Sequence, residues 1–297
     1  MAYKSGFVAI IGRPNVGKST LLNKIIGQKI VITSSKPQTT RRRINGIYTS
    51  EKGQIIFVDT PGVHKPLHKL GEFLLEEAKM SIPDADVILF LVDGTEPAGK
   101  GDEWIVNNLL NTEIPVIMAI NKIDLVKSPE KRAENIESYK KLFAARPVPT
   151  VTISAKTGRN MDDLLNNIYR KLPKGPAYYS EDEITTQDMK AIVAETIREK
   201  VLRNTKEEVP HSVAVMIDYF HEKEEITEIS ASIYVEAESQ KGIIIGDKGS
   251  MLKKIGTEAR IDIEALLEAK VFLDLHVKVR KKWRKNPSDL KRFGYTP

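Results

Sequence analysis

A glycine-containing segment that ends in a lysine and a serine, Gly12 to Ser19, is the stretch of this chain best suited to phosphate chemistry. It follows the apolar run 7–11 and precedes residues 20–26, whose apolar positions have helical spacing. A strand that turns through glycines into a helix directs backbone N–H groups and the positive end of the helix at one point, which suits a triphosphate. Lys18 adds a charge for the β- and γ-phosphates, and the Ser19 hydroxyl is a Mg²⁺ ligand. The pattern predicts a phosphate-binding P-loop.

The polar segment 33–43 follows, with little regular periodicity. A threonine in such a loop can complete the Mg²⁺ shell when a γ-phosphate is present and let go after hydrolysis. We choose Thr40 as this ligand, and the neighbouring Thr39 is the alternative. For Arg41 to Arg43, a solvated surface explains the charges at least as well as a contact role does.

The next apolar run, 54–58, ends in Asp59 and a tight turn that closes at Gly62. Parallel strands of an open sheet deliver their C-terminal ends to the same crevice, so we expect Asp59 to arrive beside the P-loop. There it can hold the metal through a water molecule, and the Gly62 N–H can meet the γ-phosphate.

Asn121, Lys122 and Asp124 follow another apolar strand. A carboxylate that faces a purine edge accepts hydrogen bonds from N1–H and the 2-amino group of guanine, and adenine offers neither. The wrong base leaves that carboxylate unpaired, which is the costly kind of mismatch. Asp124 therefore favours GTP over ATP, and the short loop 154–156 after the last strand can cover the base.

The second half of the chain contains a GXXG loop, Gly246 to Gly249, between an apolar run and a helix. Glycines remove side-chain bulk, so an RNA or single-stranded DNA backbone can approach closely, while Lys248 meets phosphate and nearby apolar surface receives unstacked bases. The elements around the loop are predicted in the order helix, strand, strand, helix, helix, strand. That order matches a KH domain of the prokaryotic type.

A basic segment follows the last predicted strand, 271–279. Between Lys270 and Arg292 lie nine Lys or Arg and two Asp, so the net charge of +6 is concentrated beside the GXXG loop. This placement favours tracking of phosphates over a merely solvated tail. Trp283 can stack on a base or anchor the last helix, and anchoring is the better explanation.

The order of elements predicts an α/β protein: a P-loop G domain with a doubly wound, mostly parallel sheet, followed by an α+β KH domain of the prokaryotic type. Two prolines and a glycine within 172–180 mark the boundary. We place the G domain at 1–173, a linker at 174–184 and the KH domain with its basic extension at 185–297.

Composition sets further limits. The 297 residues include 41% hydrophobic and 29% charged residues, which is typical of a soluble globular protein. The absence of cysteine excludes disulfides and thiolate metal sites, and it fits a reducing cytoplasm. Because no apolar run approaches the length of a membrane span, we expect any membrane contact to be peripheral.

The motifs Gly12 to Ser19, the threonine loop, Asp59 to Gly62, Asn121 to Asp124 and 154–156 together resemble the G domain of translation-factor-like GTPases. The resemblance assigns each motif its role in binding GTP and Mg²⁺. Val63 stands where signalling GTPases have a catalytic glutamine, so the resemblance is to the branch with a hydrophobic residue there. In that branch the asparagine of the P-loop, which is Asn15 in this chain, is associated with a bound K⁺. We expect slow intrinsic hydrolysis, and the use of K⁺ here is left open.

A G domain followed by one such KH domain is similar to the Era family of bacterial ribosome-assembly GTPases, and the resemblance covers nearly the whole chain. It implies a GTP-to-GDP switch that binds 16S ribosomal RNA near its 3′ end on the 30S subunit precursor. It also implies a cytoplasmic monomer with a peripheral fraction at the inner face of the cell membrane.

The predicted site residues fall into four groups. The expected GTP-binding residues are Gly12, Arg13, Pro14, Asn15, Val16, Gly17, Lys18, Ser19, Thr20, Asp59, Thr60, Pro61, Gly62, Asn121, Lys122, Asp124, Ser154, Ala155 and Lys156. The expected catalytic residues are Lys18, Thr40 and Gly62, and the expected Mg²⁺ site is Ser19, Thr40 and Asp59. The expected RNA-binding residues are Ile243, Ile244, Ile245, Gly246, Asp247, Lys248, Gly249, Lys253, Arg280, Lys281 and Lys282.

Two rival functions are kept. The first is a membrane-associated signalling GTPase whose KH-like domain contacts protein or lipid headgroups, and weak RNA binding would support it. The second is a constitutive RNA-binding chaperone whose G domain is only structural, and undetectable GTP turnover with RNA and K⁺ present would support that. A DNA-binding function is less favoured, because the chain has no helix-turn-helix, zinc or basic-zipper pattern, although a KH fold can accept single-stranded DNA.

Overall fold

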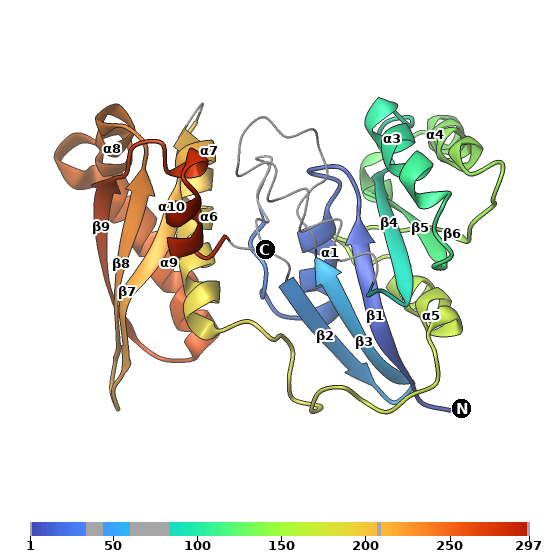
Figure 1. The fold of residues 1–297 in the computed structure, drawn as a ribbon, viewed down its shortest axis with the longest axis horizontal. Coiled ribbons are helices and arrows are strands. Elements are labelled where there is room, and N and C mark those ends of the chain that lie inside the picture. The colour runs from blue at the N-terminus through green and yellow to red at the C-terminus, as the bar shows by residue number, and fades with distance from the viewer. Residues whose placement is uncertain (1, 34–43, 60–83, 207–208, 296–297) are drawn as a thin grey trace. The chain divides into compact units, whose positions relative to one another are not determined.

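The computed structural model describes residues 2–33, 44–59, 84–206 and 209–295, without the side chain of His211. These residues form two compact units (Figure 1). The first unit contains the described residues up to 31, 44–59 and 84–186, and the second contains 32–33 and those from 187 onward.

The first unit is a six-stranded sheet with helices on both faces, in the strand order β2-β3-β1-β4-β5-β6. Only β2 runs antiparallel to its neighbour, β3, and the other pairs are parallel. This is the doubly wound sheet predicted from the sequence. Its elements are β1 (Lys4–Ile11), α1 (Lys18–Ile26), β2 (Ile44–Ser50), β3 (Gly53–Asp59), β4 (Val87–Asp93), α3 (Lys100–Leu109), β5 (Val116–Asn121), the 3₁₀ turn η1 (Ile123–Leu125), α4 (Pro129–Leu142), β6 (Thr150–Thr152) and α5 (Met161–Lys171).

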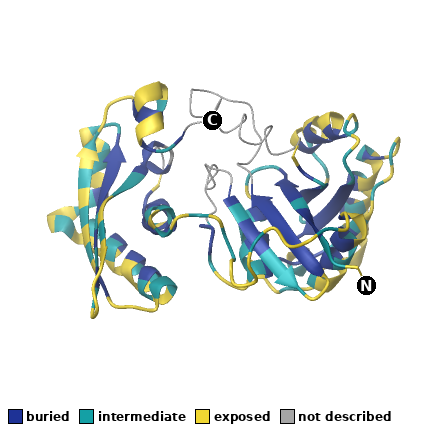
Figure 2. Ribbon diagram, turned by 60° about the horizontal axis from the view of Figure 1, so that its bottom comes forward, coloured by how far each residue is buried: buried dark blue, intermediate teal, exposed yellow. Residues whose placement is uncertain are grey.

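The central strands of this sheet are buried on both faces, which is why they read as continuous apolar runs. Along β4, Leu89 joins the core that α1 and α5 cover, while the next residue, Phe90, joins the core that α3 and α4 cover. Figure 2 shows these strands as almost uniformly buried. The sheet is therefore a rigid support for the loops at its strand ends.

Helix starts in both units follow residues that suit the N-cap position. The Ser128 hydroxyl accepts a hydrogen bond from the backbone N–H of Lys131 (3.2 Å), and Pro129 occupies the first turn of α4. The Asp188 carboxylate accepts one from Lys190 N–H at the start of the first helix of the second unit. These side chains satisfy backbone donors that a helix leaves without a partner.

Residues 174–186, which include the predicted linker, belong to the first unit. The fully buried amide of Gln54 explains much of this: its Oε1 accepts from the N–H groups of Tyr178 and Tyr179, and its Nε2 donates to the Tyr179 carbonyl. Thr185 also forms a bridge to Gly46 on β2. The chain therefore follows the edge of the first sheet before it enters α6 (Met189–Asn204).

The second unit is a three-stranded sheet, β7-β8-β9, with β7 antiparallel and β9 parallel to the central β8. The order of its main elements is the one predicted for a prokaryotic-type KH domain. They are α6 (Met189–Asn204), α7 (Val209–Ser212), β7 (Ala214–Glu222), β8 (Thr227–Val235), α8 (Glu238–Ile245), η2 (Asp247–Gly249), α9 (Ser250–Leu267), β9 (Val271–Val279), η3 (Trp283–Lys285) and α10 (Pro287–Arg292).

Helices cover one face of this sheet, where Ala231 and Ile233 of β8 pack with Val193 of α6 and Ile255 of α9. The final segment is anchored by Trp283, which is fully buried and donates a hydrogen bond from Nε1 to the Ser212 carbonyl (2.8 Å). This confirms the anchoring role predicted for that tryptophan.

Candidate functional site

The ends of parallel strands in the first unit bring the predicted phosphate, metal and base residues to one edge of the sheet. β1 leads into the P-loop, β3 ends at Asp59, and β5 ends at Asn121. Register places Asp59 beside Ile10, two residues before the loop begins. Residues separated by about a hundred positions in the chain thus meet at one place.

Two glycines let the P-loop pass close to neighbouring atoms. A Cβ on Gly12 would lie 2.2 Å from the Leu91 carbonyl oxygen, and one on Gly17 would lie 2.4 Å from Asn121 Nδ2. Gly17 also has a φ of 104°, a backbone conformation that glycine adopts far more easily than other residues. The loop ends there and α1 begins at Lys18.

The Lys18 ammonium is held inside the loop that it serves. Its Nζ donates to the carbonyl oxygens of Gly12 and Arg13, both at 3.1 Å, and the residue is 7% exposed. Burial lowers the pKa of Lys18 to about 8, while the nearby Asp59 carboxylate acts in the opposite direction. A phosphate placed here would meet a cation that has already been taken out of water.

Ser19 and Asp59 lie together as a hard-oxygen pair. The Ser19 hydroxyl donates to Asp59 Oδ2 (3.1 Å), and Asp59 is fully buried. A hydroxyl and a carboxylate beside a phosphate site are the donors that Mg²⁺ prefers, so these residues fit the metal. Some of the predicted or discussed positions lie outside the described residues. They are Thr40 with its alternative Thr39, Thr60, Pro61, Gly62 and Val63.

Asn121 connects the phosphate side of the site to the base side. It is 2% exposed, its Nδ2 donates to the Val16 carbonyl (2.9 Å), and its Oδ1 accepts from Ala155 N–H (2.9 Å). The loop 154–156 is therefore tied to the P-loop through one amide. Asp124 lies three residues along the chain in the turn η1 and is partly exposed.

Lys122 makes a second connection to the P-loop. Its Nζ donates to the Asn15 carbonyl (2.7 Å) and pairs with Asp93 Oδ2 (2.6 Å). Partial burial would raise the pKa of Asp93, but hydrogen bonds from Lys122 and Thr95 outweigh it and lower that pKa. The sequence analysis missed Asp93, although a carboxylate at the end of an apolar strand is the same signal that identified Asp59.

In the second unit the GXXG loop has three residues with a positive φ, a backbone conformation that glycine adopts most easily. Gly246 and Gly249 have φ values of 72° and 81°, and Lys248 between them has a φ of 47°. A Cβ on Gly246 would lie 2.7 Å from the Cβ of Met251. The side chains of Asp247 and Lys248 are exposed, so the loop presents its backbone, one carboxylate and one cation to solvent.

A groove of about 550 Å³ runs beside this loop, between α9 and β9. Apolar residues from both elements line it, and Lys253 and Arg260 add positive charge. The lining residues are Gly249, Leu252, Lys253, Gly256, Thr257, Arg260, Phe272, Leu273 and Leu275. Of these nine residues, Gly249 and Lys253 were predicted to bind RNA, and the other seven were not.

The structure separates the predicted RNA-binding residues into accessible and buried ones. Lys253 lines the groove, and Ile243 is 51% exposed, whereas Ile244 is fully buried in the core of the second unit. The Ile244 side chain therefore serves packing, because α8 turns it toward the sheet. Arg280, Lys281 and Lys282 follow β9 and are exposed, and Arg280 pairs with Asp289 (2.9 Å).

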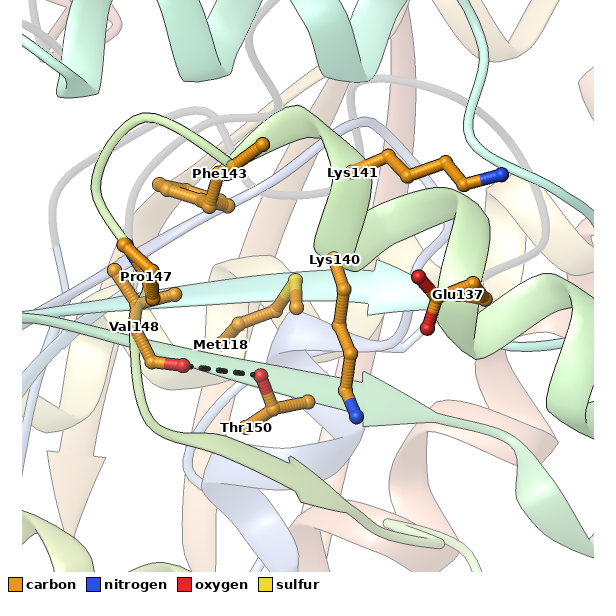
Figure 3. Close-up of a pocket in the computed structure, with 9 residues that line it drawn as sticks. Met118, Glu137, Lys140, Lys141, Phe143, Pro147, Val148 and Thr150 are labelled. Carbon is orange, nitrogen blue, oxygen red and sulfur yellow. Dashed lines mark hydrogen bonds between the residues drawn. The ribbon is translucent and has the colours of Figure 1, made fainter.

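Another cavity, of about 390 Å³, lies in the first unit between the end of α4 and strands β5 and β6 (Figure 3). Its lining residues include Met118, Phe143, Lys140 and Lys141. Those lysines occupy the last turn of α4, where cations complement the helix dipole. None of the predicted site residues lines this cavity. No helix among the described residues is long and apolar enough to cross a membrane.

Comparison with known proteins agrees with this geometry. The family model described as a 50S ribosome-binding GTPase matches residues 7–122, and the KH domain model matches 208–284. GTPase Era of Halothermothrix orenii is 52% identical over 296 residues, which is 99% of each chain. This chain belongs to the Era family. GTPase Era of Carboxydothermus hydrogenoformans is 49% identical and covers the whole of this chain.

Two solved Era structures match almost the entire chain. A variant of Aquifex aeolicus Era bound to GDP·AlF₄⁻ matches 99% of it with a TM-score of 0.94 and 42% identity. Era in complex with MgGDPNP and nucleotides 1506–1542 of 16S ribosomal RNA matches 99% of it with a TM-score of 0.95 and 41% identity. This Era-family chain is therefore a GTPase with a G domain and a C-terminal KH domain, as predicted.

Proposed function

We propose that this chain is a GTP-operated switch that binds 16S ribosomal RNA near its 3′ end during assembly of the 30S subunit. The observation that carries the proposal is the groove between α9 and β9 beside the GXXG loop. It lies in a chain that matches an RNA-bound Era along 99% of its length. In the proposal, GTP held by the first unit changes the affinity of the second unit for RNA.

On the nucleotide side, we assign the phosphates to the N–H groups of the P-loop and to Lys18. The Ser19 hydroxyl would hold Mg²⁺ directly and Asp59 would hold it through water, and the metal would neutralise charge on the β- and γ-phosphates. Asp124 would accept the guanine N1–H and 2-amino hydrogen bonds, with Asn121 and Ala155 fixing the loops on either side.

Thr40 and Gly62 complete the proposal as the groups that sense the γ-phosphate. The resemblance to GTPases with a hydrophobic residue at this position supports slow intrinsic turnover, because the Val63 side chain cannot orient the attacking water through a hydrogen bond. The same resemblance supports a K⁺ ion bound near Asn15. Slow turnover and the K⁺ ion are both part of the proposal.

On the RNA side, the groove combines features that single-stranded RNA needs. The glycines of the GXXG loop allow the sugar-phosphate backbone to approach, and the apolar walls from Leu252, Leu273 and Leu275 can receive unstacked bases. Lys253 and Arg260 supply charge for phosphates along the same path. The exposed lysines after β9 extend this positive surface and, in the proposal, also allow peripheral contact of a cytoplasmic monomer with an anionic membrane.

Nucleotide affinity should fall as pH rises through about 8. In the free protein burial lowers the pKa of Lys18 to about 8, whereas bound phosphate favours the charged ammonium and raises that pKa in the complex. Binding therefore takes up a proton above pH 8, and the affinity for GDP should decline by up to about tenfold per pH unit there. Below about pH 7.5 it should be nearly constant.

Titration calorimetry with GDP between pH 7 and 8.8, in two buffers of different ionisation enthalpy, measures both the affinity and the proton uptake. The account predicts uptake that grows from pH 7 toward 8.8. Affinity that stays flat to pH 8.8, or proton release on binding, would contradict the assignment of Lys18.

Gly249→Asp should weaken binding of single-stranded RNA about tenfold while GTP affinity stays intact. A Cβ at Gly249 meets no atom within 4 Å, so the new side chain points into open space. There its carboxylate repels the RNA backbone, and the φ of 81° adds strain. Fluorescence anisotropy with a labelled strand copying the 3′ end of 16S RNA measures the effect.

Gly249→Asn is the matched control, because asparagine has nearly the same shape and adopts this backbone conformation about as readily as aspartate does, without adding charge. It should lose much less affinity than Gly249→Asp. If both variants bind RNA as tightly as the original chain, the GXXG loop does not contact RNA.

A further inference from the structure

The side chain of Arg13 reaches the start of α3, where two carboxylates hold it. Its Nε donates to Asp102 Oδ1 (2.9 Å) and its Nη2 donates to Glu96 Oε1 (2.5 Å). Partial burial disfavours the charged guanidinium, but the two carboxylates outweigh this effect and raise the pKa of Arg13. The P-loop is thus linked at its second residue to a helix that precedes the base-recognition loop.

Asp102 is suited to a fixed link. It is fully buried, and its second oxygen, Oδ2, accepts a hydrogen bond from Gly99 N–H (3.0 Å) at the start of α3. Both carboxylate oxygens are therefore engaged, one by the helix and one by Arg13. Removal of Arg13 would leave a buried charge without its cation, which is strongly unfavourable. Glu96, by contrast, has a half-exposed side chain, and such pairs contribute little.

Gly101 provides the space that Arg13 occupies. A Cβ on Gly101 would lie 2.8 Å from Arg13 Cδ and 3.5 Å from Cγ, both in the middle of the side chain. Gly101 is in α3, where alanine would favour the helix more than glycine does. The glycine is thus locally unfavourable, and the path of Arg13 explains it.

The link acts on the phosphate site through the backbone of Arg13. Its carbonyl and that of Gly12 are the two acceptors of the Lys18 ammonium. We propose that Arg13 is a positioning residue: through Asp102, and with Gly101 leaving room, it holds the P-loop against α3 in the conformation that receives the nucleotide phosphates. This inference rests on GTP binding by the P-loop and adds a residue that acts through the loop's shape.

Gly101→Ala is the test, because it changes no charge and alters Arg13 only through the space that its side chain needs. The gain in helix propensity and the weakened Arg13–Asp102 pair act in opposite directions on the thermal stability of the nucleotide-free chain, so the rate of GDP release is the deciding readout. Displacement of Arg13 predicts that GDP dissociates about three- to tenfold faster and binds correspondingly more weakly. Turnover at saturating GTP should match that of the original chain, so the change is in KM and not in kcat.

Gly242→Ala in α8 is the matched control, since a Cβ there meets no atom within 4 Å and the residue lies in the other unit. It should leave GDP dissociation unchanged. Stopped-flow release of a fluorescent GDP analogue from each full-length chain measures the rates. If Gly101→Ala releases GDP at the original rate, the proposed role of Gly101 and Arg13 is wrong.

A mutant cycle over Arg13→Ala and Asp102→Asn separates positioning from general destabilisation. We expect each single variant to speed GDP release. The double variant should be no faster than Arg13→Ala, because the two substitutions break the same Arg13–Asp102 contact. Additive effects on release, or lower stability with unchanged release, would overturn the proposal. Failure of the original chain to bind GDP would instead refute the P-loop assignment itself, so the two failures are distinguishable.

Discussion

Lys18→Ala should remove measurable binding of both GTP and GDP, with a loss of affinity of about 100-fold or more. The ammonium is the one cation that the described P-loop holds inside itself, between the carbonyls of Gly12 and Arg13. Its removal leaves the phosphates with the backbone N–H groups of the loop and the metal, without the buried side-chain cation. Titration calorimetry with Mg²⁺ present measures the loss directly.

The same substitution should not unfold the chain. The lowered pKa of Lys18 means that burial disfavours its charged form at pH 7, so alanine should leave the nucleotide-free protein at least as stable. Thermal unfolding of the two chains without nucleotide provides this control. GTP affinity equal to that of the original chain would refute the P-loop assignment.

Asp124→Asn should lower GTP affinity about 100-fold or more and move the preference toward xanthosine triphosphate. The asparagine offers an N–H donor where guanine also presents donors, whereas xanthine presents a carbonyl oxygen at that edge. Asp124 is well placed for this role, because Lys122 before it and Asn121 at the end of β5 are both bound to P-loop carbonyls.

Competition among GTP, xanthosine triphosphate and ATP for a fluorescent nucleotide measures the preference. ATP serves as the control, since its purine edge offers neither of the two donors that Asp124 reads, and it should stay a poor ligand of both chains. A variant that still selects GTP strictly would refute the base-reading role.

Most of the first unit could be predicted because its signals are local. A strand buried on both faces reads as an unbroken apolar run, and β4 shows this along Val87 to Val92. Each run ends in a residue whose chemistry suits the site, such as Asp59 or Asn121. The parallel sheet then brings these ends together without further information from the sequence. The structure places Lys18 and Ser19 beside Asp59, as this reasoning predicts.

Pairings between distant segments could not be predicted. Arg13 of the P-loop meets Asp102 of α3 only in the folded chain, and nothing in the local sequence of either residue shows it. The burial of Ile244 is similar, because one turn of α8 decides which of three consecutive isoleucines faces the core. The groove is formed by α9 together with β9, which lies outside the GXXG motif. The motif alone therefore could not identify Leu273 and Leu275 as lining residues.

The most direct test of a GTP-operated RNA switch is the RNA affinity of the full-length chain with a non-hydrolysable GTP analogue and then with GDP, across a salt series. The ligand is a short strand that copies the 3′ end of 16S ribosomal RNA. We predict tighter binding with the analogue, a log–log salt slope of about 0.7 per phosphate contacted, and an equal gain in analogue affinity when RNA is present. Equal RNA affinity in both nucleotide states would contradict the account and leave an RNA-binding protein with an uncoupled GTPase.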